Sequence, residues 1–201
     1  MKSKVRTSGD LSLISPAHLE AAKLGKKYFQ TDTANVADKF KGMSVEDINS
    51  ELRKTANPFA VCFEHWIGDF NISTGIRNAN AFNVQDVYYI GDKKWDRRGA
   101  VGVHNYTPIN WISNLDELNS LKDRYTIIGI DNIPGSVPMK TYQWKPNTLM
   151  VFGEEGVGLT PGMQALCQDV VHIEMFGSVR SLNCGTASGI VMYDFVSKLS
   201  L

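Results

Sequence analysis

The sequence predicts an α/β protein with a mostly parallel sheet, helices on both faces, and a short helical extension at the N-terminus. Two observations lead to this fold class. From residue 57 onward, short apolar runs alternate with segments of helical pattern, which is typical of parallel strands buried on both faces. Before residue 57 only helical patterns occur. We therefore expect an N-terminal extension, residues 1–56, and a second domain, residues 57–201.

Two helix signals occur in the expected extension. Ser15 and Pro16 would begin a helix over residues 17–29, because proline is favoured in the first turn. Ser44 and Asp47 resemble a capping pair, which would open a helix through Lys54.

The second domain contains the strands and helices of the predicted sheet. The expected strands are short apolar runs at residues 59–63, 87–90, 125–130, 148–152 and 170–173. The expected helices have apolar residues near helical spacing and span residues 72–82, 115–121, 161–167 and 187–199. Ligands of such sheets bind outside the carboxyl ends of the strands. The candidate ligand loops are therefore residues 64–71, 131–138, 153–160 and 174–183.

Composition limits the function classes. Lys and Arg total 21, as do Asp and Glu, so bulk charge does not favour nucleic-acid binding. A nucleic-acid site would have to be a local patch. Its candidates are Lys93, Lys94, Arg97 and Arg98, joined by Arg77 and Arg180 if the fold brings them near.

Nothing in the sequence indicates a membrane or a metal. No window approaches the roughly 20 apolar residues of a membrane span, and no apolar stretch follows the basic first residues as in a secretory signal. We therefore expect a cytoplasmic protein. Three cysteines and four histidines lie far apart without ligand-like spacing, so we expect no metal and interpret the cysteines as small buried residues.

Three segments carry candidate chemistry. The first follows the first strand and places Asn71, a candidate N-cap, and Arg77 on a helix. The second, residues 152–161, combines three glycines with Glu154 and Glu155. It matches neither G-x-G-x-x-G nor a P-loop, and its acids would repel phosphate, so it suits an uncharged or cationic group or the positioning of an arginine.

The third segment follows the last expected strand and enters a helix of small residues, 185–189. Glycine weakens a helix by about 1 kcal/mol relative to alanine. Something packed closely against this helix should compensate. An adenosyl group and another segment of the chain both satisfy that requirement.

In this order, the three segments resemble the motifs of the SpoU/TrmH family of RNA ribose 2'-O-methyltransferases. Asn71 and Arg77 are similar to its Asn-x-Gly-x-x-x-Arg pattern, and Ser73 stands where the family usually has glycine. Its Gly-x-Glu-x-x-Gly-Leu pattern resembles the segment from Gly153 through Glu155 to Leu159. Its Ser-Leu-Asn signature resembles Ser181, Leu182 and Asn183. The resemblance covers residues 57–201.

The resemblance implies a C-terminal deep trefoil knot, a site for S-adenosylmethionine within that knot, and a homodimer whose active site uses residues of both chains. The implied cofactor contacts are backbone groups of Ile130, Gly153, Ile173 and Leu182. The implied catalytic residues are Asn71, Arg77, Glu155, Ser181 and Asn183. The implied reaction is methylation of a ribose 2'-hydroxyl in structured RNA.

Roles for these residues follow from their chemistry. The pKa of arginine lies above about 12, so we expect Arg77 to bind a phosphate beside the target ribose and to stabilise developing alkoxide charge rather than act as a free base. Glu155 would orient Arg77 or Asn71. Asn183 would help fix the hydroxyl, and Ser181 would support the knot loop.

The substrate and two rival functions stay open at this point. The compact extension, with Lys23, Lys26, Lys27, Lys39 and Lys41, weakly favours tRNA over a large rRNA. For Ser73 we expect a small change in substrate fit. The alternatives are a non-catalytic knotted RNA-binding protein and an unrelated nucleotide-binding α/β enzyme.

Overall fold

The computed structural model describes residues 36–66, 70–91 and 95–199. Contacts divide the chain into two compact units, residues 1–41 and 42–201. In the first unit the structure describes a short 3-10 helix, η3 (Asp38–Phe40), whose Asp38 pairs with Lys41 at 2.5 Å. The helix expected over residues 17–29, with Lys23, Lys26 and Lys27, lies outside the described residues.

Helix α2 (Val45–Lys54) begins where the sequence predicts. The hydroxyl of Ser44 accepts a hydrogen bond from the backbone N–H of Asp47 at 3.1 Å, so the cap is confirmed. Further along, the side-chain amide of Asn83 donates to the Leu52 carbonyl at 3.0 Å. Helix α2, which we assigned to the extension, thus packs within the unit that contains the sheet. The domain boundary at residue 56 stays a prediction.

Seven strands of the described residues form one sheet, and every neighbouring pair is parallel. Their order is β3-β2-β1-β6-β4-β7-β5. The strands are β1 (Asn57–Glu64), β2 (Val84–Ile90), β3 (Ile109–Ile112), β4 (Thr126–Ile130), β5 (Val137–Pro138), β6 (Thr148–Phe152) and β7 (Asp169–His172). All five expected strands are present. Strand β3 was missed because the polar Asn110 interrupts its apolar run, and β5 was missed because its 2 residues are too few to form a pattern.

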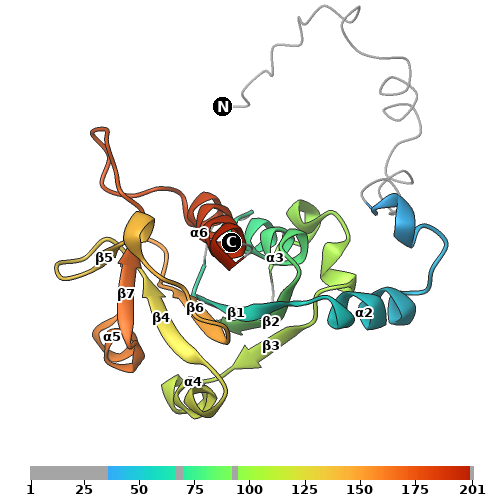
Figure 1. The fold of residues 1–201 in the computed structure, drawn as a ribbon, viewed down its shortest axis with the longest axis horizontal. Coiled ribbons are helices and arrows are strands. Elements are labelled where there is room, and N and C mark those ends of the chain that lie inside the picture. Colours follow the sequence, from blue (N-terminus) through green and yellow to red (C-terminus); the bar gives the residue numbers. More distant parts are fainter. Residues whose placement is uncertain (1–35, 67–69, 92–94, 200–201) are drawn as a thin grey trace, which may run out of the picture. The chain divides into compact units, whose positions relative to one another are not determined.

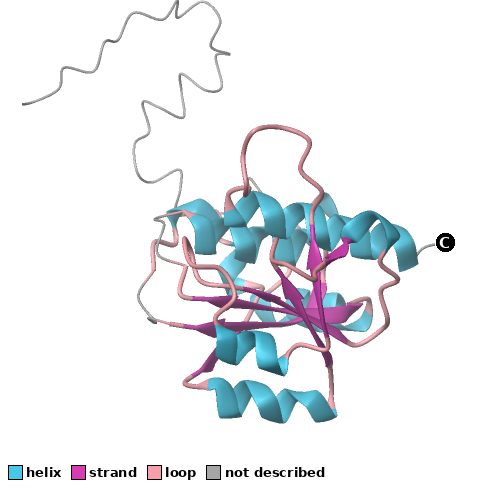
Figure 2. Ribbon diagram, turned by 90° about the vertical axis from the view of Figure 1, so that its left-hand side faces the viewer, coloured by secondary structure: helices cyan, strands magenta, loops and turns pink. Residues whose placement is uncertain are grey.

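Helices cover both faces of this sheet (Figures 1 and 2). On one face lie α3 (Asn71–Ala81) and α6 (Cys184–Leu199), packed against alternate β1 residues such as Val61. On the other lie α4 (Leu115–Ser120) and α5 (Pro161–Leu166), packed over the intervening residues such as Cys62. Five short 3-10 helices complete the described part: η3, η4 (Arg98–Ala100), η5 (Val103–Asn105), η6 (Leu121–Asp123) and η7 (Met139–Thr141). The predicted fold class is confirmed.

The small residues of α6 pack against α3. A β-carbon at Gly185 would lie 3.0 Å from Thr74, and one at Gly189 would lie 3.1 Å from Asn78. The amide of Asn78 also donates to the Gly185 carbonyl at 2.8 Å. The sequence predicted that either an adenosyl group or a chain segment packs against the small residues of α6. The structure shows a chain segment, α3, against Gly185 and Gly189. Ala187 borders the cavity described below.

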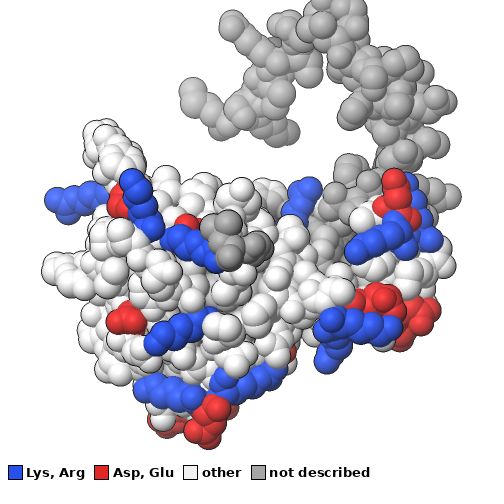
Figure 3. Space-filling model, viewed as in Figure 1, with Lys and Arg blue, Asp and Glu red and all other residues white. Residues whose placement is uncertain are grey.

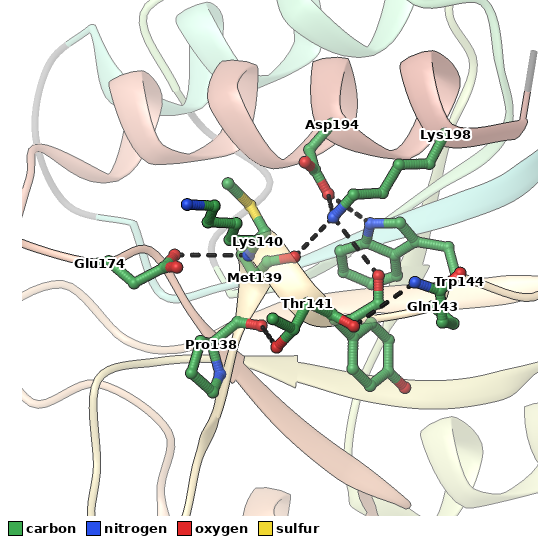
Figure 4. A network of polar contacts seen from close by, with 10 residues as sticks. Pro138, Met139, Lys140, Thr141, Gln143, Trp144, Glu174, Asp194 and Lys198 are labelled. Carbon is green, nitrogen blue, oxygen red and sulfur yellow. Dashed lines mark hydrogen bonds and ion pairs between the residues drawn. The ribbon is translucent and has the colours of Figure 1, made fainter. Parts of the chain in front are cut away.

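The far end of α6 is held by a polar network (Figure 4). The ammonium of Lys198 donates to the carbonyl of Met139 at 2.6 Å and pairs with Asp194 at 2.8 Å. Asp194 also accepts a hydrogen bond from the indole of Trp144 at 2.7 Å. These contacts join α6 to the segment between β5 and β6. The predicted knot concerns how the chain is threaded, and it stays a prediction.

Within residues 36–66, 70–91 and 95–199, no helix is both long and apolar enough to cross a membrane. In that part of the chain, no three His, Cys, Asp or Glu side chains are arranged to hold a metal ion.

Candidate active site

A cavity of about 610 Å³ opens at the carboxyl ends of β4, β6 and β7. Three of the four expected ligand loops border it, each following one of these strands. These three loops therefore lie together at the carboxyl ends of the strands, where ligands of parallel sheets bind. Its walls include all four expected cofactor contacts and three of the expected catalytic residues, namely Ile130, Gly153, Ile173, Leu182, Glu155, Ser181 and Asn183.

The loop after β6 is a tight turn held at both ends. The backbone N–H of Glu154 donates to the Gly158 carbonyl at 3.0 Å, and the Gly158 N–H donates back at 2.8 Å. The carboxylate of Asp131, at the end of β4, accepts from the Leu159 N–H at 2.8 Å. These bonds hold the turn at the cavity rim.

Gly153 occupies the narrowest part of this turn. A β-carbon there would lie 2.3 Å from the Gly158 carbonyl carbon and from the Leu159 nitrogen, so no other residue fits without moving backbone. Its carbonyl accepts a hydrogen bond from the indole of Trp66 at 3.1 Å. The absence of a side chain is therefore a packing requirement, and it leaves the Gly153 backbone at the cavity wall.

A hydrogen-bond network connects the three motifs. The side-chain amide of Asn71 donates to Oε1 of Glu155. Asn183 donates from Nδ2 to Oδ1 of Asn71 at 2.9 Å. Oδ1 of Asn183 accepts from the Thr186 N–H at 3.2 Å, as an N-cap of α6 would. Residues from the ends of α3, the β6 turn and α6 thus share one polar cluster.

Cys184 belongs to the same cluster. Its thiol donates to Oε1 of Glu155 at 3.2 Å. Burial, followed by this hydrogen bond to the carboxylate, raises the pKa of the Cys184 thiol to about 12. The thiol is therefore protonated at neutral pH and acts as a donor that fixes the Glu155 carboxylate rather than as a nucleophile.

Asn71 differs from the predicted N-cap. The structure places Phe70 in that position, and Asn71 is the first residue of α3. The prediction was wrong because the amide contacts Glu155 and Asn183 instead of the first-turn N–H groups. Of the two partners expected for Glu155, Arg77 or Asn71, the structure shows a hydrogen bond with Asn71, and the orienting role of Glu155 stays a prediction.

Arg77 lies apart from this cluster. It is exposed on α3 and does not border the cavity. Within residues 36–66, 70–91 and 95–199, no hydrogen bond or ion pair joins it to Glu155. Ser181 borders the cavity and is exposed. Its expected support of the knot loop stays a prediction.

Sequence reasoning missed several residues of the cavity. Asp131 was within an expected ligand loop but had no assigned role, although an acid directly after a strand was a signal. Arg180 had been considered only for a nucleic-acid patch. Its carbonyl accepts from the Asn132 amide at 3.3 Å, which joins the loops after β4 and β7. The other unassigned lining residues include His172, Met175, Cys184 and Ala187.

The charges around the cavity favour a cationic ligand. Asp131, Glu154 and Glu155 supply three carboxylates, and Arg180 supplies one guanidinium, so the formal charge of these four residues is −2. Such a wall would repel phosphate groups. Figure 3 shows Lys and Arg at separate places around one face of the molecule, with Asp and Glu among them.

Known proteins of similar sequence include RNA methyltransferases. A 23S rRNA (guanosine-2'-O-)-methyltransferase of Haemophilus ducreyi is 27% identical over 168 residues, which is 80% of this chain and 68% of that protein. Its counterpart in Vibrio vulnificus is 28% identical over 164 residues, 78% of this chain and 66% of that protein. The matched part therefore spans about two thirds of these relatives.

Solved structures share the fold. A TrmH/SpoU tRNA modifying enzyme of A. aeolicus superposes with a TM-score of 0.68, at 22% identity, over 78% of this chain and 84% of that one. The SpoU methyltransferase AviRb of Streptomyces viridochromogenes, in complex with AdoMet, gives 0.66 at 24% identity over 72% and 59%. The model of the SpoU rRNA Methylase family matches residues 58–193. The chain belongs to the SpoU rRNA methylase family.

Proposed function

We propose that this chain transfers the methyl group of S-adenosylmethionine to a ribose 2'-hydroxyl of RNA, and that ribosomal RNA is its substrate. The observation that carries the proposal is the network of Asn71, Glu155 and Asn183 beside a cavity whose walls come from the loops after β4, β6 and β7. Membership of a family of RNA 2'-O-ribose methyltransferases supports the same activity.

The cavity fits the proposed cofactor. Its volume of about 610 Å³ lies within the range of about 300 to 1,000 Å³ usual for small-molecule sites. The acidic wall suits the positive sulfonium of S-adenosylmethionine, which supplies an electrophilic methyl group. Ile130, Gly153, Ile173 and Leu182 offer backbone groups that would hold it, and the missing side chain of Gly153 leaves its backbone accessible at the wall.

The polar cluster would position the ribose. Glu155 is fixed by donors from Asn71 and Cys184, so its carboxylate holds the Asn71 amide in one orientation. Asn183 is fixed on the other side by Asn71 and Thr186. Together, the Asn71 and Asn183 side chains would orient the hydroxyl, and such alignment contributes much of the acceleration of group transfer.

Arg77 would act from a second copy of the chain. Its exposed position outside the cavity is what a homodimer with shared active sites requires. In that arrangement the guanidinium binds the phosphate beside the target ribose and stabilises negative charge on the attacking oxygen.

Ribosomal RNA replaces tRNA as the proposed substrate. The weak preference for tRNA rested on the short extension, and the curated relatives, which are 23S rRNA (guanosine-2'-O-)-methyltransferases, do not support it. A cytoplasmic location is part of the proposal, since the substrate is found there.

The test is transfer of a labelled methyl group to rRNA and tRNA, followed by mapping of ribose methylations in cells with and without the gene. We expect a single ribose in rRNA to be modified. Arg77→Ala should abolish turnover while the affinity for S-adenosylmethionine stays the same, and retained turnover would contradict the role of Arg77. RNA binding without methyl transfer to any RNA would instead support the non-catalytic alternative.

A further inference from the structure

The described part of the loop between β2 and η4, residues 95–97, and η4 itself are fixed to the start of α3. A β-carbon at Gly99, in η4, would lie 2.8 Å from the Ser73 β-carbon and 3.0 Å from a ring carbon of Phe70. Ser73 is fully buried, and its hydroxyl donates to the carbonyl of Asp96. Close packing and one buried hydrogen bond therefore hold this loop in place.

Ser73 is the position at which this chain departs from the usual glycine of the motif. Glycine has no hydroxyl, so the bond to the Asp96 carbonyl depends on serine. On the other side of the contact, Gly99 has no side chain and so leaves room for that of Ser73. Ser73 therefore links the helix that carries Asn71 to the loop that carries Trp95, Arg97 and Arg98.

This loop presents cations over aromatic rings. The guanidinium carbon of Arg97 lies 5.8 Å from the centre of the Trp95 ring, and that of Arg98 lies 5.7 Å from the Phe70 ring. Phe70 is 52% exposed. Asp96 accepts a hydrogen bond from Nε of Arg98 at 2.9 Å and so fixes its guanidinium. Among the described residues, Arg97 takes part in no ion pair.

We propose that an RNA-contacting surface is formed by Phe70, Trp95, Arg97 and Arg98, here called the β2 loop surface. Ser73 is the positioning residue that holds it. This inference rests on the proposed function. Guanidinium groups would bind phosphates next to the target nucleotide. The exposed ring of Phe70 would stack on an unpaired base, the usual way in which single-stranded RNA is bound, while Trp95, partly buried against the core, would support Arg97.

Location and charge favour RNA over a protein partner. The loop follows the carboxyl end of β2, at the same edge of the sheet as the cavity. Phe70 directly precedes Asn71 of the catalytic network, so RNA whose ribose reaches Asn71 would lie close to Phe70. Arg97, Arg98 and Asp96 leave a formal charge of +1, which suits a phosphate backbone.

The experiment measures binding of a fluorescent single-stranded RNA by anisotropy, at several salt concentrations and without cofactor. Arg97→Ala and Arg98→Ala should each weaken binding by roughly threefold to tenfold and lower the slope of affinity against salt by about 1. Arg124→Ala is the matched control. Arg124 also lies over an aromatic ring, 4.9 Å from that of Tyr125, and pairs with Asp86 at 2.7 Å, but it precedes β4 at the opposite edge of the sheet. Its removal should leave binding unchanged.

Ser73→Ala keeps the β-carbon and removes the hydrogen bond to Asp96. We expect the KM for RNA to rise by roughly threefold to tenfold, because the arginines that bind phosphates are held less firmly. The kcat and the dissociation constant of S-adenosylmethionine should stay at wild-type values. A serine with only a packing role would lower the melting temperature and leave that KM unchanged, which would overturn its positioning role.

The remaining outcomes separate the two proposals. Unchanged RNA binding in both arginine variants would overturn the β2 loop surface, as would a change of oligomeric mass, because the surface would then be an interface between copies of the chain. If the arginine variants lose RNA binding but the wild-type protein methylates no RNA, the β2 loop surface is supported and the proposed function is contradicted.

Discussion

Replacing Gly153 by alanine should damage both the β6 turn and cofactor binding. The new β-carbon would lie 2.3 Å from two backbone atoms of the turn, Gly158 C and Leu159 N. Ordinary carbon contacts are about 3.5 to 4.0 Å, so backbone has to move by more than about 1 Å. Gly158 and Leu159 are held by hydrogen bonds to Glu154 and Asp131 at 2.8 Å each, which such a movement would stretch.

The magnitude follows from these contacts. Overpacking of this kind costs about 1 to 3 kcal/mol, and weakening one hydrogen bond adds about 1 kcal/mol. For a chain of this size, a loss of about 2 to 4 kcal/mol lowers the melting temperature by roughly 4 to 16 °C. The affinity for S-adenosylmethionine should fall more than about tenfold, because Gly153 is part of the cavity wall and a backbone shift of about 1 Å disrupts fixed contacts there.

Calorimetric titration with S-adenosylmethionine and thermal unfolding measure the two effects. Gly177→Ala is the matched control, since a β-carbon at Gly177 would meet no atom within 4 Å and the residue lies in the neighbouring loop after β7. It should behave as wild type. Wild-type affinity in Gly153→Ala would refute the assignment of this turn to the cofactor site.

The other predictions concern catalysis, protonation and stability. Glu155→Gln should lower kcat by at least about tenfold with little change in cofactor affinity, because an uncharged acceptor holds Asn71 less firmly, and single-turnover transfer measures this. Iodoacetamide at pH 8 should label Cys184 slowly, since its pKa is about 12, and faster in Glu155→Gln. Glu64→Gln should raise the melting temperature at pH 7.5 but not near pH 4. Burial raises the pKa of Glu64, so the native state favours the protonated form and loses stability as the pH rises above the ordinary carboxyl pKa. Lys198→Met should lower the free energy of unfolding in urea by about 1 to 3 kcal/mol, because two carbonyls lose their donor and Asp194 loses its cation.

Each of these has a control or a contrary result. Exposed Lys54 pairs with Glu51 on α2, so Lys54→Met should change stability by less than about 0.5 kcal/mol. An equal loss in both lysine variants would argue against the α6 network. Labelling of Cys184 in the native protein as fast as in urea would contradict its raised pKa. A lower melting temperature at pH 7.5 in Glu64→Gln would mean that the carboxylate has a stabilising partner.

Much of the fold could be predicted because local pattern and tertiary structure agree. The strands of the sheet interior are continuous apolar runs, and the Ser44 cap is a local signal. Strands β3 and β5 could not be predicted, since their few residues are defined by the neighbours with which they pair. The prediction of an N-cap at Asn71 was wrong for a similar reason. The Asn71 side chain forms hydrogen bonds with residues far away in the sequence.

The candidate site was predicted by loop position and by the family motifs rather than by contacts. The ligand loops and the contact of Glu155 with Asn71 were predicted in this way. The roles of Asp131 and Cys184 depend on distances between loops that no spacing along the chain reveals. The position of Arg77 outside the cavity is likewise a property of the three-dimensional fold.

The network at the centre of the site joins distant parts of the chain. Asn71 contacts Glu155, 84 residues further on, and Asn183, 112 residues further on. Contacts of this sequence separation form late, because the chain must lose much entropy before they become favourable. During synthesis, the first half of the sheet can pair while the site does not yet exist. Catalytic activity should therefore appear only after residue 183 has reached its place beside α3, and recovery of activity should report the last step of folding.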